Sequence, residues 1–478
     1  GVPRIDPLVS TSIGLIMGLR SEDGVYSKFL GIPYAHVDEG NPFGLSTPYP
    51  PFDEPFHAYD GSVVCPQVDR QGQPEGHIQC LALNVYVPNG AHSQNRLPVM
   101  VYIHGGAFVE GSGTNPLGSP KYLLQKDVIV VFINYRVGLY GFLCTESPKA
   151  PGNIGLKDQL LALRWVKQHI ESFGGDSDKV TVFGESAGAM SVHMHLLSPH
   201  EKVFDRAIIQ SGPSTSPFTI EEVNNNVAFE VAKILGLTTD NLDEAIDFVA
   251  RTNVDLAIAA ANQVKKNSQY SEPATKACVE MEFDGIERFL EENPNTARSE
   301  KAKTIPIIIG YDSQELIFQH GGQNADFFSN YSFKDLLSFG FDVIDFEEMI
   351  DIVRHFYIGD DAPSKELENE ITSFASDFVF NHPTERAITL LLESEAKAVY
   401  HYMFSYIGGL STVAMMNTTI AGASHTDEMM YLLESNIPST ASSEVGAEDE
   451  LMIDRMTTMW TNFAKYGCVP KKNLNNKQ

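Results

Sequence analysis

The stretch from Val180 to Val192 constrains the fold of this chain more than any other. It reads Val-Thr-Val-Phe-Gly-Glu-Ser-Ala-Gly-Ala-Met-Ser-Val, so a β-branched and aromatic run passes through Gly184-Glu-Ser-Ala-Gly188 into a helix-compatible run. A strand that enters a helix through so tight a turn holds its central residue in a strained backbone and exposes that side chain at the end of a sheet. The sequence therefore predicts a strand–turn–helix unit with Ser186 at its tip. The alternative is a glycine-rich turn that only joins two elements.

Short β-rich runs alternate with helical patterns along the 478 residues. Several runs are apolar on both faces, which is typical of parallel strands covered by helices on both sides. Residues Gly155 to Phe173 carry apolar side chains at helical spacing and stop at Gly174-Gly175, as expected of a βαβ crossover. We therefore expect an α/β fold with a mostly parallel central sheet. The predicted strands are Leu83–Val87, Val99–His104, Val128–Tyr135, Val180–Phe183, Ala207–Gln210, Ile305–Gly310 and Val399–Ser405.

Two blocks of the chain, at about 213–298 and 327–397, have a largely helical pattern. They come late in the strand order, so we expect them to be helical insertions that cap the carboxyl edge of the sheet. No linker divides the chain clearly, and we expect one domain over residues 1–478.

The charge balance excludes two classes of partner. The chain has 34 Lys and Arg against 62 Asp and Glu, a formal net charge of −28. Such a surface repels phosphate backbones and anionic lipid, so we expect no nucleic-acid partner. The longest apolar run among the predicted strands, Val128–Ile133, is too short to span a bilayer, and no membrane span is expected.

A serine hydroxyl needs a base and an acid nearby to become a nucleophile. In open α/β sheets the three partners follow in the order serine, acid, histidine. Asp312 and Glu315 come after a buried strand, and from the residues alone either could be the acid. His425, one of 14 histidines, stands in a small-residue loop before a helical run. His193 and His195 are closer to Ser186, but helix geometry aims them away from the turn, so we expect them to pack in the core or support the site.

A loop rich in small residues follows the strand that ends at Ile103. The run His104-Gly-Gly-Ala-Phe108 matches the loop whose backbone N–H groups stabilise an oxyanion in this type of site. Because the sequence also predicts Ser186 at the tip of a strand–turn–helix unit, an oxyanion-binding loop is the stronger interpretation and a purely structural glycine turn the weaker one.

The chain has five cysteines, Cys65, Cys80, Cys144, Cys278 and Cys468, and an odd number leaves at least one unpaired. Cys65 and Cys80 bracket a polar loop and could close it. The cysteine and histidine spacings that indicate metal sites are absent, and no metal is expected. Two sequons begin at Asn330 and Asn417 and are candidates for glycosylation if the chain is secreted.

With these motifs on the page, the chain resembles the type-B carboxylesterases, a family that includes the cholinesterases, and is most similar to insect carboxylesterases. The similar segments follow one another nearly from end to end. They are Phe29–Ala35, Cys80–Tyr86, Asn134–Arg136, Gly141–Leu143, Gly152–Gln159, Phe173–Asp176, Gly184–Gly188, Gln210–Gly212 and Trp460–Lys465.

The resemblance implies roles for residues that match the family's motifs. Ser186 is expected to be the nucleophile, Glu315 rather than Asp312 the acid, and His425 the base, with no cofactor. The backbone N–H groups of Gly106, Ala107 and Ala187 are expected to form the oxyanion hole. The flanking residues Gly105, Phe108 and Glu185 are expected to shape or support the pocket.

The resemblance also concerns the disulfides. Cys65–Cys80 corresponds to the family's first disulfide, which implies an oxidising, secreted setting. The family's second disulfide is not evident from the sequence, because Cys278 has no obvious partner, and the state of Cys144, Cys278 and Cys468 is left open. Ile78-Gln79 stand where the family usually has Glu-Asp, and the arginine that usually pairs with that Glu is absent from the matching segment Asn41–Phe43 as well.

The expected substrate is a small-molecule ester that is neutral and apolar, such as an acetate odorant, a xenobiotic or a lipid-like ester. Cholinesterases bind their cation on a tryptophan in the first disulfide loop, and here Pro66–Gln79 contains no aromatic residue. Juvenile hormone esterases typically carry Gln where Glu185 stands, so that assignment is the alternative, beside a non-catalytic adhesion protein on the same fold. A lipase would need an exposed apolar lid, which the sequence does not reveal. Oligomeric state is left open.

Overall fold

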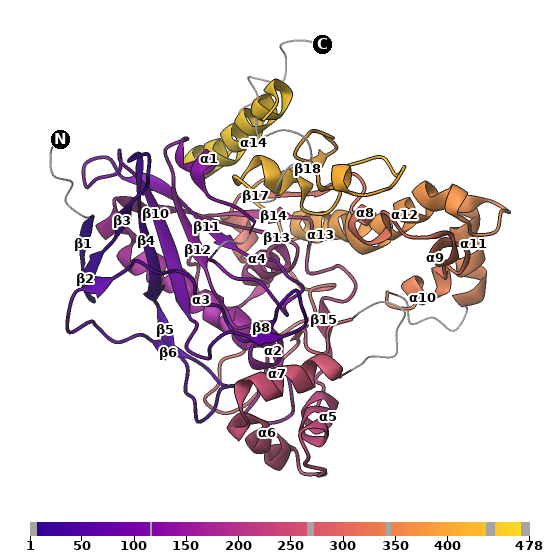
Figure 1. Cartoon of the computed structure of the whole chain (residues 1–478), viewed down its shortest axis with the longest axis horizontal. Coiled ribbons are helices and arrows are strands. Elements are labelled where there is room, and N and C mark those ends of the chain that lie inside the picture. The colour runs from indigo at the N-terminus through magenta and orange to yellow at the C-terminus, as the bar shows by residue number, and fades with distance from the viewer. Residues whose placement is uncertain (1–6, 115–116, 265–271, 341–345, 436–444, 470–478) are drawn as a thin grey trace.

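A computed structural model describes residues 7–114, 117–264, 272–340, 346–435 and 445–469. Its centre is a nine-stranded sheet that runs through the molecule (Figure 1). In sheet order the strands are β18 (Val399–Phe404), β17 (Ile307–Asp312), β14 (Arg206–Gln210), β13 (Gly175–Glu185), β11 (Leu97–Ile103), β12 (Ile129–Ile133), β10 (Ala82–Pro88), β4 (Tyr26–Pro33) and β3 (Leu19–Arg20).

The strands from β18 to β12 pair in parallel, as predicted, and the predicted strand Leu83–Val87 corresponds to β10 beside them. Each predicted strand is present, with ends shifted by a few residues. The largest difference is at β13, which starts at Gly175 and not at Val180 and is therefore longer than predicted. Strand β10 runs antiparallel to both β12 and β4, so the sheet is mixed at this side. Strands β3 and β4 were not among the predicted strands. A separate small sheet holds β1 (Leu8–Thr11), β2 (Gly14–Met17) and β7 (Phe56–His57).

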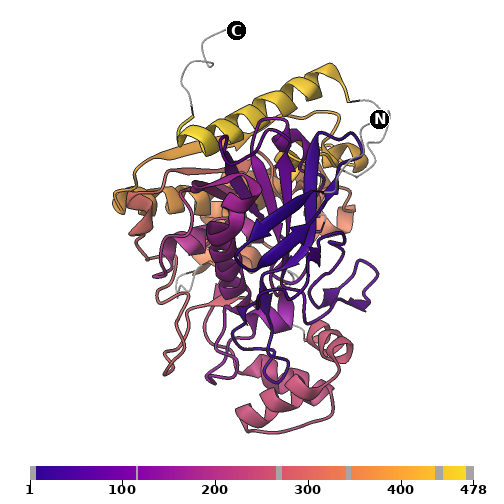
Figure 2. The ribbon, with the colours of Figure 1, turned by 90° about the vertical axis from the view of Figure 1, so that its left-hand side faces the viewer.

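The alternation of side chains along β11 explains why both faces of the sheet are covered. Val99, Val101 and Ile103 enter one core with helices α3 (Ile154–His169) and α4 (Ala187–Leu197). Met100 and Tyr102 enter a second core, with α1 (Lys121–Leu124) and α14 (Ala447–Tyr466). In Figure 2, α14 lies across one end of the view in yellow. Two buried faces make the strand apolar throughout, and this is the physical basis of a parallel α/β sheet.

Two further groups of helices have small cores of their own and lie on different sides of the sheet in Figure 1. The first group contains α2 (Gly138–Phe142), α5 (Asn226–Ile234), α6 (Leu242–Arg251) and α7 (Val254–Gln263). The second contains α8 (Ile317–His320), α9 (Ala325–Ser329), α10 (Phe333–Leu337), α11 (Phe346–Ile358) and α12 (Glu368–Ser376), and α13 (His382–Glu393) follows it. In the described part of the chain after Gln263, the first block continues mainly as loop, with the short β16 (Ala277–Cys278).

The structure contains a second disulfide, which was not evident from the sequence. Besides Cys65–Cys80, the structure contains a disulfide between Cys144 and Cys278, which are 134 residues apart. Such a separation gives no local sequence signal. The backbone makes room for it at Gly152, where an added Cβ would lie 2.6 Å from both sulfur atoms. Cys468 is left exposed and unpaired.

Across the parts of the chain that the structure describes, none of the helices combines the length and the apolar character that a bilayer crossing needs.

Loss of the long-range disulfide should reduce stability more than loss of the short one. In the chain-entropy account, closing a loop of over 100 residues contributes about 4–5 kcal/mol and closing a 15-residue loop about 3 kcal/mol. We expect the pair Cys144→Ser/Cys278→Ser to lower the midpoint of thermal unfolding more than the matched pair Cys65→Ser/Cys80→Ser, measured by calorimetry without reductant. A larger loss in the second pair would contradict this assignment of loop-closure stability.

Candidate active site

Ser186 lies at the turn between β13 and α4, in a backbone conformation that side chains rarely adopt, with φ 59° and ψ −125°. The turn is possible because the helix packs directly on the neighbouring strand. An added Cβ at Gly188 would lie 1.9 Å from the carbonyl oxygen of Ile103 on β11. The backbone N–H of Ser186 donates to the carbonyl of Gln210 on β14, which fixes the turn from the other side. The predicted strand–turn–helix unit is therefore present, with its serine partly exposed.

The loop after β11 lies against this turn. Gly106, Ala107 and Phe108 have positive φ values of 111°, 54° and 63°, so three consecutive residues are held in left-handed conformations. Among the described residues, the backbone N–H groups of Gly106, Ala107 and Ala187 have no hydrogen-bond acceptor. Ala107, Ala187 and Ser186 line the same cavity. Unpaired N–H groups beside a serine can bind a negatively charged oxygen.

His425 lines that cavity and contacts the buried Glu315, where the segments after β17 and β18 come together. Nδ1 of His425 donates to Oε2 of Glu315 at 2.7 Å, and Oε1 of Glu315 accepts from the backbone N–H of Asp312 at 2.8 Å. The backbone N–H of His425 donates to the Glu315 carbonyl. Glu315 is fully buried and His425 is 8% exposed. Of the two acids that the sequence offered, Glu315 is the one that contacts the histidine.

The loop that carries His425 is held by a buried carboxylate two residues on. Asp427 accepts hydrogen bonds from the hydroxyls of Ser411 and Thr412 and from the backbone N–H of Ser424. The rings of Phe318 and Phe380 lie 5.2 and 4.7 Å from the His425 ring, centroid to centroid. The ring is thus fixed by one hydrogen bond and covered by aromatic side chains.

Glu185, the residue before the serine, contacts the other ring nitrogen of His425. Its Oε1 lies 3.1 Å from Nε2 and is otherwise buried without a hydrogen-bond partner in the described chain. Burial raises the pKa of Glu185 to about 8. Burial alone would lower the pKa of His425, but the charge of Glu185 and the hydrogen bond to Glu315 outweigh it and raise that pKa to about 9. In the described residues Ser186 Oγ has no hydrogen bond, so the histidine faces Glu185 in this structure rather than the serine.

A second pair of acids, Asp312 and Glu428, lies behind Glu315. Neither oxygen of Asp312 is reached by a hydrogen-bond donor in the described chain, and the carboxyl groups of Asp312 and Glu428 interact. Two buried carboxyl groups that interact favour a state in which one of them keeps a proton. Burial, together with the charges of Glu428 and Glu315, raises the pKa of Asp312 well above its usual value. The sequence did not point to Glu428.

The cavity at Ser186 has a volume of about 600 Å³ and a mostly apolar wall. Its aromatic and aliphatic lining comes from the second group of helices and from the loops near α4. The apolar lining includes Phe108, Met190, Pro217, Phe218, Leu316, Phe318, Phe327, Leu336, Val379 and Phe380.

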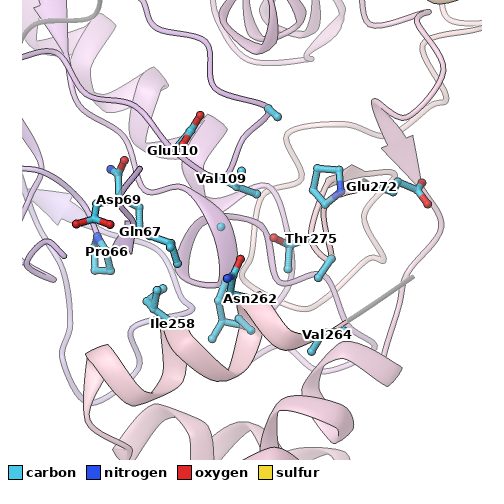
Figure 3. A pocket seen from close by; sticks show the side chains of 17 residues that line it. Pro66, Gln67, Asp69, Val109, Glu110, Ile258, Asn262, Val264, Glu272 and Thr275 are labelled. Carbon is cyan, nitrogen blue, oxygen red and sulfur yellow. The ribbon is translucent and has the colours of Figure 1, made fainter. Parts of the chain in front are cut away.

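A second cavity, of about 690 Å³, adjoins the first (Figure 3). The two share Ala107, Glu272 and Pro273 as lining residues. Figure 3 shows acidic side chains, among them Asp69 and Glu110, around this hollow.

Other predicted residues lie outside the two cavities. His193 accepts a hydrogen bond from the N–H of Ser214, and His195 is hydrogen-bonded to Gln159; both histidines are buried. Asn330 and Asn417 are exposed. No group of residues suited to hold a metal ion occurs in the described ranges.

The loop of the first disulfide needs no ion pair at Gln79. Its side chain accepts from the backbone N–H of Val37 and donates to the carbonyl of the same residue. A neutral amide therefore satisfies the backbone of Val37 at this point of the loop.

Comparison with known proteins gives the class. Residues 5–478 match the carboxylesterase family. The chain is 31% identical to a juvenile hormone esterase of Tribolium castaneum, over 98% of this chain and 85% of the relative. It is 33% identical to esterase FE4 of Myzus persicae, over 94% of this chain and 82% of the relative. The crystal structure of juvenile hormone esterase from Manduca sexta, with OTFP covalently attached, superposes with a TM-score of 0.83 at 28% identity, covering 98% and 91% of the two chains.

The chain therefore belongs to the carboxylesterase family, has the α/β-hydrolase fold, and is a carboxylic ester hydrolase. These findings confirm the family and the fold that the sequence motifs predicted.

Replacing Glu185 should lower the pKa of His425. The substitution Glu185→Gln removes a negative charge 3.1 Å from Nε2 and so disfavours the charged ring. We expect the pKa to fall by about one unit or more, measured by NMR titration of the ring signal that is missing in His425→Asn. Glu54→Gln, the same change at an exposed site, should leave the titration unchanged. A His425 pKa that stays at about 9 in the first variant would contradict the charge contact.

Replacing Asp312 should change stability in a pH-dependent way. The folded protein keeps a proton on this group at pH values where the unfolded chain, with a pKa near 3.8, has lost it. The contribution of Asp312 to the stability of the wild-type chain therefore falls as pH rises above that value, by at most about 1.4 kcal/mol per pH unit. In Asp312→Asn the amide can donate to Glu428 without this proton, so the variant should gain stability over the wild type between pH 4 and pH 7.

The measurement is the free energy of unfolding in urea at several pH values. Asp53→Asn, at an exposed position, serves as the matched control. A difference between Asp312→Asn and wild type that is constant with pH would show that Asp312 is ionised in the folded chain.

Proposed function

We propose that this chain is a serine carboxylesterase that hydrolyses neutral, apolar esters through an acyl-serine intermediate. The observation that supports it most is the convergence of three elements on one cavity: Ser186, the unpaired N–H groups beside it, and the hydrogen-bonded pair of His425 and Glu315. The covalent attachment named for the Manduca sexta relative supports an adduct-forming mechanism in this family.

In the proposed reaction, Ser186 Oγ attacks the ester carbonyl while His425 takes the hydroxyl proton. The carbonyl oxygen becomes negative and is stabilised by the N–H groups of Gly106, Ala107 and Ala187. His425 then gives its proton to the leaving alcohol as the C–O bond breaks. Water attacks the acyl-serine by the same route, releases the acid and restores the serine. Glu315 keeps the imidazole in one tautomer and stabilises its charged form throughout.

This mechanism requires the ring of His425 to leave Glu185. Productive contacts in sites without substrate are often loose and tighten only in the complex. Ester binding in the cavity excludes water and places the hydroxyl of Ser186 against Nε2. Glu185, with its raised pKa, can hold a proton while the ring serves the serine.

The lining of the cavity supports the substrate class. Its aromatic and aliphatic wall favours apolar groups, and the net charge of −28 disfavours anionic esters. The volume of about 600 Å³ is in the range of small-molecule pockets. The similarity to juvenile hormone esterases favours a hormone-type esterase as the second candidate, with a long apolar ester as substrate.

Two disulfides support a secreted location, because disulfides persist in oxidising compartments. In that setting the exposed side chains of Asn330 and Asn417 are available for glycosylation.

The proposal predicts that Ser186→Ala abolishes ester hydrolysis. Loss of a nucleophile typically reduces kcat by about four to six orders of magnitude. The measurement is release of p-nitrophenol from p-nitrophenyl butyrate, together with covalent labelling by an organophosphate followed by mass spectrometry. Ser191→Ala, one turn further along α4 with a hydroxyl bonded to the helix backbone, should still be labelled. Absence of both turnover and labelling in the wild-type chain would refute the mechanism and favour a non-catalytic role.

A further inference from the structure

One polar side chain interrupts the apolar inner wall of the cavity. His320, the last residue of α8, lines the cavity and is 1% exposed. Gln319 and Gln323 also line it, but they are exposed to solvent. The His320 ring is surrounded by the rings of Phe327, Phe328 and Tyr331 at 5.3, 6.0 and 5.6 Å between centroids, all edge to face. Such surroundings fix the orientation of the imidazole.

The hydrogen bond at Nδ1 determines which nitrogen of His320 carries the proton. Nδ1 lies 2.8 Å from the hydroxyl of Thr372 on α12. Thr372 is fully buried, and in the described chain its hydroxyl has no other acceptor. A buried hydroxyl that donates nowhere is costly, so the Thr372 proton goes to Nδ1. The neutral ring then carries its hydrogen on Nε2.

Nε2 is the atom that remains for a ligand. Nε2 has no hydrogen-bond partner among the described residues. It is also not one of the unpaired polar atoms that are completely buried, so part of its surface remains accessible. Since the ring lines the cavity, its N–H is open to an occupant. Burial lowers the pKa of His320 to about 4, so the donor is uncharged at neutral pH.

We propose that His320 is a specificity-determining residue, whose Nε2–H donates to an acceptor oxygen that the substrate carries in addition to its reacting ester group. The preferred ester is then apolar over most of its length and has a second oxygen, of ether or carbonyl type, at the place that meets His320. This inference rests on the proposed esterase function and adds a substrate class to it.

The cost of leaving the Nε2–H of His320 unpaired determines which esters the cavity prefers. A hydrocarbon ester would bury the N–H against methylene groups and leave it unpaired, and an ester with an acceptor there would satisfy it. A site that contains a buried donor therefore discriminates against substrates that lack the matching atom. A neutral hydrogen bond of this kind corresponds to about tenfold in kcat/KM.

The test is an ether scan. In dodecyl acetate and in methyl dodecanoate, one methylene at a time is replaced by oxygen, and kcat/KM is measured for each ester and its hydrocarbon parent. We expect one or two neighbouring positions at which the ratio of ether to parent is about tenfold higher for the wild type than for His320→Phe. The phenyl ring keeps the approximate shape of the imidazole and removes the donor.

Two further variants make the result specific. His193→Phe is the matched control, because His193 is also buried, bonded at Nδ1 and neutral, but lies outside the cavity lining. Its ether-to-parent ratios should equal those of the wild type. Thr372→Val removes the group that fixes the tautomer and should give intermediate ratios, which provides an independent test if His320→Phe does not fold.

Three outcomes decide the matter. Position-dependent ratios that fall in His320→Phe or in Thr372→Val, and not in His193→Phe, support the inference. Ratios that are equal in the wild type and in the His320 and Thr372 variants at every position overturn it, while turnover of the esters leaves the esterase function intact. Absence of turnover of every ester, including p-nitrophenyl butyrate, by the wild type refutes the proposed function and this inference with it.

Discussion

The close contact between α4 and β11 is the constraint on which the site depends. With no side chain at Gly188, the helix backbone rests on the carbonyl of Ile103, and this proximity forces the left-handed backbone at Ser186. The same contact brings the loop after Ile103 to the serine, with its unpaired N–H groups. A strained residue persists only where the surroundings hold it, and here a nine-stranded sheet with cores on both faces does so. The stability of the whole fold thus maintains a local geometry that is unfavourable by itself.

Electrostatics around His425 depend on an unusual number of buried acids. Glu185, Glu315, Asp312 and Glu428 all lie within one region that is closed to solvent. Burial disfavours the charged form of each carboxyl group and repulsion between neighbouring acids adds to this effect, so the pKa values of Glu185, Asp312 and Glu428 are raised. Protons retained on some of these groups leave Glu315 as the acid that faces Nδ1 of the ring. The cluster therefore sets the charge that the histidine experiences, beyond the single acid of a serine–histidine–acid arrangement.

Much of the architecture could be predicted because it depends on local patterns. Each predicted parallel strand is present, since a strand buried on both faces leaves an apolar run that is visible in the sequence. Strand β4 was missed because its burial alternates less regularly and its pairing with β10 is antiparallel. The choice between Asp312 and Glu315 could not be made from position, because Asp312 ends β17, Glu315 lies three residues further on, and both are buried. Likewise, His320 and Glu428 have hydrogen-bond partners more than 50 residues away, Thr372 and Gln210, and no local sequence pattern reveals such contacts.

The disulfide between Cys144 and Cys278 has a consequence for how this protein can change over evolutionary time. Cys278 follows the first helical block and comes a few residues after Glu272–Thr275, which line the second cavity. The disulfide attaches this part of the chain to the loop before α3, which contains Cys144. Asn153 adds hydrogen bonds in both directions to the backbone of Cys278. Substitutions within α5, α6 and α7 can accumulate upstream of this anchor without displacing the segment that follows it. A lineage can therefore diversify the outer helices, and through α7 the wall of the second cavity, while inheriting the reacting centre unchanged.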